Sequence, residues 1–247
     1  MELALVVFMA SLGSIGTAAV SGALLVAGDR TLRFVPAIVS LATGTLLASA
    51  TLDLLPKALE LESASKVMGL LLAGLLGFFL LERLLVWRHA HGSDVPARGP
   101  AGELILTGDA LHNFVDGVAV GAAFVVSPAL GVGAALAVVA HELPQEVGDF
   151  GILLHSGWSR RSAYLLNVAS ALPTIPGAII AYVSFSALGG LLYAVLALAA
   201  SSFLYVALAD LVPHLNERGG GRLLAGQVAL VLLGVALIWA VGQVVPE

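Results

Sequence analysis

Residues 223–244 read LLAGQVALVLLGVALIWAVGQV and contain no charged side chain. A helix needs about 20 predominantly apolar residues to cross a lipid bilayer, so this stretch predicts a membrane-spanning helix. The rest of the chain is similar in character, because 59 % of its 247 residues are hydrophobic and 11 % are charged. Soluble domains carry about 25 % charged residues. The composition and the net charge of −5 therefore argue against a soluble enzyme, a disordered chain and a nucleic-acid-binding protein.

Hydropathy along the chain predicts an all-α integral membrane protein with eight spans in a single transmembrane domain, residues 1–247. The predicted spans are residues 2–27, 35–56, 67–87, 103–126, 129–154, 162–184, 187–213 and 223–244. The first span lacks the basic leader of a cleaved signal peptide, so we take it as a membrane helix. The chain has no cysteine, and any metal ion must therefore be bound by nitrogen and oxygen atoms.

The lysine and arginine residues orient these spans. With the N-terminus outside, the outside loops contain Lys57 and Lys66, and the inside loops contain the other nine of the eleven cationic residues. Those nine are Arg30, Arg33, Arg83, Arg88, Arg98, Arg160, Arg161, Arg218 and Arg222. Cytoplasmic loops are enriched in Lys and Arg, so we expect both termini outside the cell membrane. The inside loop Arg88–Pro100 contains His89 and His91, which are interpreted either as solvated residues or as a contact for a metal ion.

Two predicted spans end in the same pattern, D-L-x-P-x-x-x-E, at residues 53–60 and 210–217. The second span runs outward and the seventh inward, and a shared pattern on oppositely directed helices is typical of an inverted repeat. Such a repeat would pair spans 1–3 with spans 6–8 around spans 4 and 5, a 3+2+3 arrangement. The alternative is a helix-ending signal without further meaning, because proline disrupts the helix before it.

Spans 4 and 5 concentrate the ionisable residues. Span 4 contains GDALHNFVDG at Gly108–Gly117, and span 5 contains HELPQEVGDF at His141–Phe150. His112 and Asp116 are four residues apart and share one helix face. Ionisable groups cost a few kcal/mol or more inside a bilayer and usually mark a function. Imidazole nitrogen and carboxylate oxygen suit zinc and neighbouring divalent metals, so these two motifs predict a cation site.

Glycines beside the two motifs predict close packing. Gly117, Gly121 and Gly148 carry no side chain, and small residues allow helices of membrane bundles to approach closely.

The motifs resemble those of the ZIP family of divalent-metal transporters. The fourth helix of that family carries HNxxD/EG, matched by HNFVDG at His112–Gly117, and the fifth helix of one large subfamily carries HExPHExGDF, matched by HELPQEVGDF. Residues 203–210, FLYVALAD, are similar to the family's seventh helix. The resemblance implies an eight-helix fold with a transport site between helices 4 and 5.

The resemblance also implies roles for individual residues. The implied metal ligands are His112, Asp116, His141 and Glu142, with Asn113 facing an adjacent metal position. The expected ion path includes Asp53, Asp109, Asp149, Asp210 and His214. One position departs from the family, because Gln145 stands where HExPHE has His and other branches have Glu. We expect a weaker or single metal site or an altered selectivity, with Glu146 as a compensating ligand that points about 100° away.

The function expected from these observations is import of a divalent transition metal into the cytosol, with Zn²⁺ first and Cd²⁺, Fe²⁺ and Mn²⁺ as alternatives. The expected partners are the metal ion, the lipid bilayer and, as one option, a second copy in a homodimer. The alternatives are a cation-diffusion-type exporter, a metal-sensing receptor and a membrane metalloprotease. Gln145 and Pro144 interrupt the H-E-x-x-H motif that the metalloprotease needs.

Overall fold

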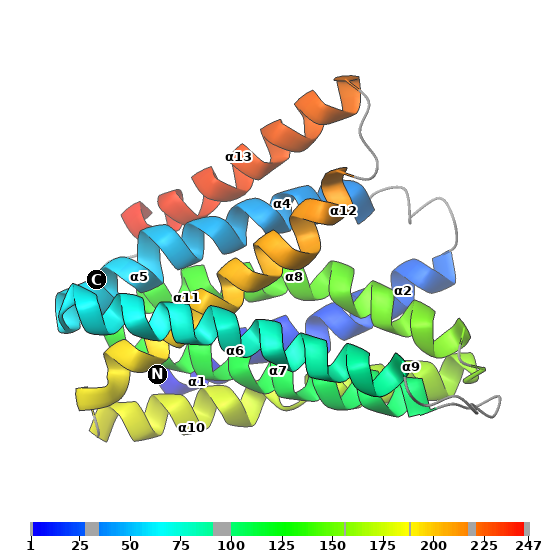
Figure 1. Ribbon diagram of the computed structural model, residues 1–247, viewed down its shortest axis with the longest axis horizontal. Helices are drawn as coiled ribbons and strands as arrows, with labels where there is room; N and C mark the ends of the chain where they lie inside the picture. The colour runs from blue at the N-terminus through cyan, green and yellow to red at the C-terminus, as the bar shows by residue number, and fades with distance from the viewer. Residues whose placement is uncertain are drawn as a thin grey trace.

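A computed structural model describes residues 2–27, 35–90, 100–155, 157–187, 189–216 and 221–244, and within these ranges it contains helices and no strand (Figure 1). The first half of the chain comprises α1 (Glu2–Ser11), η1 (Leu12–Gly16), α2 (Thr17–Ala27), α4 (Val35–Ala48), η2 (Ser49–Leu54), α5 (Leu55–Leu61), α6 (Ala64–Ala90) and α7 (Pro100–Val126). The second half comprises α8 (Pro128–His155), α9 (Arg160–Ala171), α10 (Thr174–Ala187), η3 (Gly189–Leu191), α11 (Leu192–Tyr205), η4 (Val206–Leu211), α12 (Val212–Asn216) and α13 (Gly221–Val244).

Seven helical stretches of the described residues are long and apolar enough to cross a membrane. They are Leu3–Ala23, Pro36–Leu61, Ala64–Leu81, Gly108–Val126, Arg160–Ser184, Leu192–Ala209 and Leu224–Gln243. The expected span 129–154 is the 28-residue helix α8, which is not among the seven. The polar residues of α8, namely His141, Glu142, Gln145, Glu146 and Asp149, all lie in its second half. The all-α integral membrane class expected from the sequence is confirmed.

Two details of the predicted elements differ from the structure. The expected span 162–184 is divided into α9 and α10, which are joined at Leu172 and Pro173. Proline has no backbone N–H and favours such a break. The predicted loop Arg88–Pro100 begins later, because α6 continues through His89 to Ala90, while His91 lies outside the described residues.

The repeated D-L-x-P pattern adopts the same backbone conformation twice. Asp53 is the fifth residue of the π-helix η2, and Asp210 is the fifth residue of the π-helix η4. The Leu55 N–H donates to the Ala50 carbonyl, and the Val212 N–H donates to the Ala207 carbonyl at the equivalent position. Each π-helix comes directly before the helix whose second residue is proline. A proline removes one helical hydrogen bond, and a π-bulge is one way to accommodate that loss.

Glycine allows two helix pairs to pack with their backbones in contact. A Cβ atom at Gly117 would lie 2.0 Å from the Thr174 carbonyl oxygen, and one at Gly121 would lie 2.2 Å from that of Ala178, so α7 packs tightly on α10. Gly44 of α4 is equally close to α13, where a Cβ would lie 2.0 Å from the Val231 carbonyl oxygen. The prediction of close packing is confirmed for Gly117 and Gly121. It is wrong for Gly148, where no atom of another described helix lies within 4 Å of the Cβ position.

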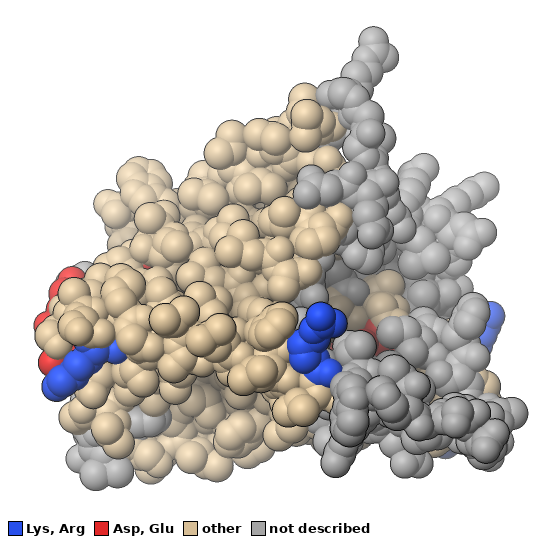
Figure 2. Space-filling model, viewed as in Figure 1, with Lys and Arg blue, Asp and Glu red and all other residues tan. Residues whose placement is uncertain are grey.

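Helix α8 lies inside the bundle and contacts α2, α4, α7 and α9. Large apolar side chains on the outer helices α6 and α13, such as Leu72, Leu80 and Leu232, are more than half exposed. This surface is suited to lipid rather than to water. Figure 2 shows a mostly uncharged described surface, with acidic and basic side chains together at the end where α5 meets α6 and further basic side chains elsewhere along the bundle. There Lys57 pairs with Glu60 and Lys66 pairs with Glu62.

Candidate metal centre

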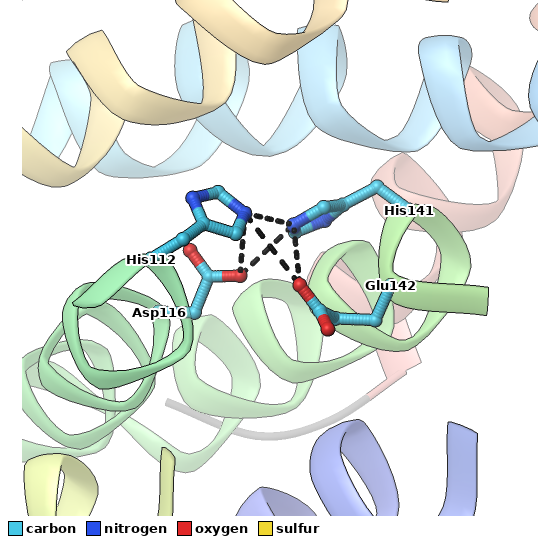
Figure 3. A group of neighbouring side chains, drawn as sticks. All are labelled: His112, Asp116, His141 and Glu142. Atoms are coloured by element: carbon cyan, nitrogen blue, oxygen red, sulfur yellow. Dashed lines mark hydrogen bonds and ion pairs between the residues drawn. The ribbon is translucent and has the colours of Figure 1, made fainter. Parts of the chain in front are cut away.

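Four ionisable side chains from α7 and α8 point toward a common centre (Figure 3). His112 and Asp116 come from α7, and His141 and Glu142 come from α8. A short turn at Ser127 joins the two helices, which therefore run in opposite directions side by side. One ligand atom from each of the four residues lies within 4.8 Å of the other three.

The distances within this four-residue cluster fit a small tetrahedral ion. The Nε2 atoms of His112 and His141 are 3.3 Å apart. His112 Nε2 is 3.7 Å from Asp116 Oδ2 and 3.5 Å from Glu142 Oε1. His141 Nε2 is 2.9 Å from Asp116 Oδ2 and 3.5 Å from Glu142 Oε1. Bonds of 2.0–2.1 Å from zinc to four tetrahedral ligands place neighbouring ligand atoms about 3.3 Å apart, so the cluster has the size of a zinc site.

The surroundings of His141 favour a proton or a metal ion at its Nε2 atom. Its Nδ1 atom lies 2.9 Å from the Ala137 carbonyl oxygen, and its Nε2 atom faces the oxygens of Asp116 and Glu142. A neutral imidazole has one N–H, so it can donate to only one of these two groups. With Nδ1–H donating to Ala137, the lone pair of Nε2 faces carboxylate oxygens and can be stabilised by a shared metal ion.

The cluster is almost closed to solvent. The side chains of Asp116, His141 and Glu142 have no exposed surface, and His112 is 16 % exposed. Apart from these contacts with the two histidine rings, both carboxylate oxygens of Asp116 and both of Glu142 lack a hydrogen-bond partner. Phe203 of α11 packs edge-on against His141, with ring centroids 5.9 Å apart. Buried carboxylates without partners are costly, and a bound cation would offset that cost.

Asn113 and Gln145 lie next to the cluster, but both side chains bond to Asp109. Asn113 Nδ2 donates to Asp109 Oδ1 over 3.1 Å, and its Oδ1 accepts from Thr174 Oγ1 over 2.8 Å. Gln145 Nε2 donates to Asp109 Oδ1 over 3.3 Å. These two of the seven predicted ligands therefore contact Asp109 and not the four-residue cluster. We call Asn113, Gln145 and Asp109 the second polar layer.

Glu146, the seventh predicted ligand, faces α9. Its carboxylate accepts a short hydrogen bond from Asn167 Nδ2, which also donates to the Glu146 backbone carbonyl over 3.3 Å. Glu146 has no exposed surface, and Asn167 is 1 % exposed.

The residues predicted to form an ion path lie on both sides of the cluster along the chain. Asp109 is buried in the second polar layer, and Asp149 is partly buried on α8. Asp53 reaches α8 at Gly133, where a Cβ atom would lie 2.9 Å from Asp53 Oδ2. Asp210 lies in η4 and His214 in α12, but their side chains lie outside the described part of the structure.

Our reading of the sequence missed the polar residues of α9 and α10 that bond to these layers. Asn167 donates a hydrogen bond to Glu146, Thr174 donates one to Asn113, and Ser170 donates one to the Asn167 carbonyl. Their spacing of three and four residues could have revealed them in the sequence, because it places polar groups along one face of an otherwise apolar predicted span.

Comparison with known proteins agrees with the chemistry of the site. A sequence profile described as "ZIP Zinc transporter" matches residues 88–242, which is more than half of the chain. The chain belongs to the ZIP zinc transporter family. Membership of a transporter family argues against the metalloprotease alternative and against the cation-diffusion-type exporter, which is a different family.

Three relatives show how far the similarity extends. Zinc transporter ZIP4 of Mus musculus is 51 % identical over 110 residues, which are 44 % of this chain and 16 % of that protein. Zinc transporter ZIP10 of Homo sapiens is 34 % identical over 176 residues, or 64 % of this chain and 21 % of that protein. Metal cation symporter ZIP8 of Rattus norvegicus is 40 % identical over 129 residues, or 51 % of this chain and 27 % of that protein. The matched part of the chain thus spans about a quarter or less of each relative.

Proposed function

We propose that this protein transports divalent transition-metal ions, Zn²⁺ first among them, through the cluster of His112, Asp116, His141 and Glu142. The observation that carries the proposal is the set of distances between the four ligand atoms, 2.9–3.7 Å for the five pairs that include a histidine. Those distances fit a tetrahedral ion with two nitrogen and two oxygen ligands. The names of the ZIP4 and ZIP10 relatives support zinc as the substrate.

The ligand set also suits ions related to zinc. Cd²⁺, Fe²⁺ and Mn²⁺ accept imidazole and carboxylate ligands, and the name of the ZIP8 relative is that of a metal cation symporter. Two carboxylates neutralise the charge of a divalent ion, so the bound ion can remain in an apolar bundle at moderate cost. Gln145 contributes no carboxylate here, and the proposal is therefore a single four-ligand position at this level of the bundle.

The proposed topology is eight spans in one transmembrane domain, with α8 as the fifth span. The equivalent π-helices η2 and η4 support an inverted repeat of spans 1–3 and 6–8. The arginine distribution supports both termini outside a cell membrane and import into the cytosol. Lipid would contact the exposed leucines of α6 and α13. A homodimer is compatible with this arrangement and can be tested by cross-linking in membranes.

Reconstituted vesicles test the proposed function. Wild-type protein should take up ⁶⁵Zn²⁺, and the variants His112→Ala and Asp116→Ala should each abolish uptake because each loses a metal ligand. Glu60→Ala is the control, because this side chain is 63 % exposed at the far end of α5. Normal uptake by both ligand variants would refute the site. Vesicles with the metal gradient in each direction, with and without a pH gradient, would separate import from export.

A further inference from the structure

A second set of buried oxygen atoms lies one helical turn away from the four-residue cluster. Asp109 is three residues before His112, and Glu146 is four residues after Glu142, which are shifts of about 4.5 and 6 Å along the helices. Because α7 and α8 run in opposite directions, both shifts point to the same end of the bundle. Gln145, which bonds to Asp109, is the residue next to Glu146 in the chain.

Hydrogen bonds link each of these two carboxylates to a neighbouring helix. Gln145 joins α8 to Asp109, and Asn167 joins α9 to Glu146. Ser170 of α9 donates its proton to the Asn167 carbonyl over 3.0 Å. These bonds, together with the shared shift of one turn, place Asp109, Glu146 and Asn167 near one level of α7, α8 and α9.

Each of these three side chains keeps one oxygen atom without a partner. Asp109 Oδ2, Glu146 Oε1 and Asn167 Oδ1 are all buried and accept no hydrogen bond. Among the residues that the structure describes, no lysine or arginine pairs with Asp109 or Glu146. Buried polar atoms are nearly always hydrogen-bonded, so three unpartnered oxygens on neighbouring helices are candidates to coordinate a cation.

We propose that the oxygens of Asp109, Glu146 and Asn167 form a second position for a divalent cation, separate from the histidine-containing cluster. Two carboxylates supply the charge that balances a divalent ion, and the amide oxygen supplies a neutral ligand. Ligands that are all oxygen favour Mn²⁺ and other hard cations and hold zinc less tightly than imidazole does. The role of this second position in transport rests on the proposed function. In that function, the ion leaves the histidine-containing cluster through this weaker position.

Mn²⁺ binding to the purified full-length protein tests the second position. The double variant His112→Ala/His141→Ala removes the imidazole ligands and serves as the background, and electron paramagnetic resonance counts the Mn²⁺ that remains free. We expect one Mn²⁺ bound per chain in this background. Adding Asp109→Asn or Glu146→Gln should weaken binding by at least about tenfold, since even the loss of a group supporting a ligand has effects of that size.

Two further variants separate a ligand role from a structural role. Asn167→Asp adds a carboxylate of nearly the same size and should tighten Mn²⁺ binding, whereas a purely structural asparagine would give weaker or unchanged binding. Glu60→Gln removes an exposed carboxylate and should leave binding unchanged. Thermal unfolding with a chelator checks that each variant is folded.

The second position is refuted if the background variant binds no Mn²⁺, if Asp109→Asn and Glu146→Gln both bind it normally, or if Asn167→Asp does not tighten it. Zinc uptake by wild-type vesicles separates this failure from a failure of the proposed function. If wild-type vesicles take up zinc but the background variant binds no Mn²⁺, the proposed function stands and the second position is refuted. If wild-type vesicles take up no zinc, the proposed function is refuted whether or not Mn²⁺ binds.

Discussion

Gly117→Ala should separate α7 from α10 and disturb the polar layer beside the metal cluster. The added Cβ atom would lie 2.0 Å from the Thr174 carbonyl oxygen and 2.7 Å from its carbonyl carbon. An ordinary carbon–oxygen contact is about 3.3 Å, so the backbone of α10 must retreat by about 1.3 Å. This movement would also stretch the 2.8 Å hydrogen bond from Thr174 to Asn113, which is one helical turn from Gly117.

The expected loss of stability follows from these two effects. Overpacking of a helix interface costs about 1–3 kcal/mol, and the broken hydrogen bond costs about 1 kcal/mol more. For a chain of this length, each kcal/mol lowers the melting temperature by about 2–4 °C. We therefore expect Gly117→Ala to melt roughly 5–15 °C below the wild type.

Thermal unfolding in detergent and zinc uptake in vesicles measure the two consequences of Gly117→Ala. Gly77→Ala is the matched control, because no atom lies within 4 Å of the added Cβ on α6. Alanine is the better helix former by about 1 kcal/mol, so this control should be neutral or slightly stabilised. A Gly117→Ala protein with wild-type melting temperature and uptake would refute the argument that glycine holds α7 against α10.

Two further substitutions test single contacts. Gln145→Glu should raise uptake of Mn²⁺ relative to Zn²⁺, because it replaces the amide that bonds Asp109 with a third carboxylate; an unchanged ratio in metal-panel uptake assays would place Gln145 off the ion path. Ser159→Ala should destabilise the protein by about 1 kcal/mol, because Ser159 caps α9 by accepting from the Ser162 N–H over 3.1 Å. Ser159→Asp should retain the cap, and equal melting of all three proteins would contradict that role.

Much of the fold could be predicted because hydropathy is a local property of the chain. Long apolar runs predicted the outer spans such as 223–244, and the breaks between them are close to the helix ends. The break inside 162–184 was missed, although Pro173 marks the point where α9 ends and α10 begins. The matching π-helices also lay beyond prediction, although the repeated D-L-x-P pattern marked both places.

The sequence by itself determined that the protein lies in a membrane and that spans 4 and 5 carry its chemistry. Ionisable residues are rare in apolar helices, so His112, Asp116, His141 and Glu142 stood out without a structure. Only the tertiary structure decided which four of the seven candidate ligands form the cluster and which three contact other side chains. Adjacent residues on a helix point about 100° apart, and the rotation of a helix against its neighbours is set by packing. That rotation directs His141 and Glu142 together toward α7, and turns Asn113 toward Thr174 and Glu146 toward Asn167.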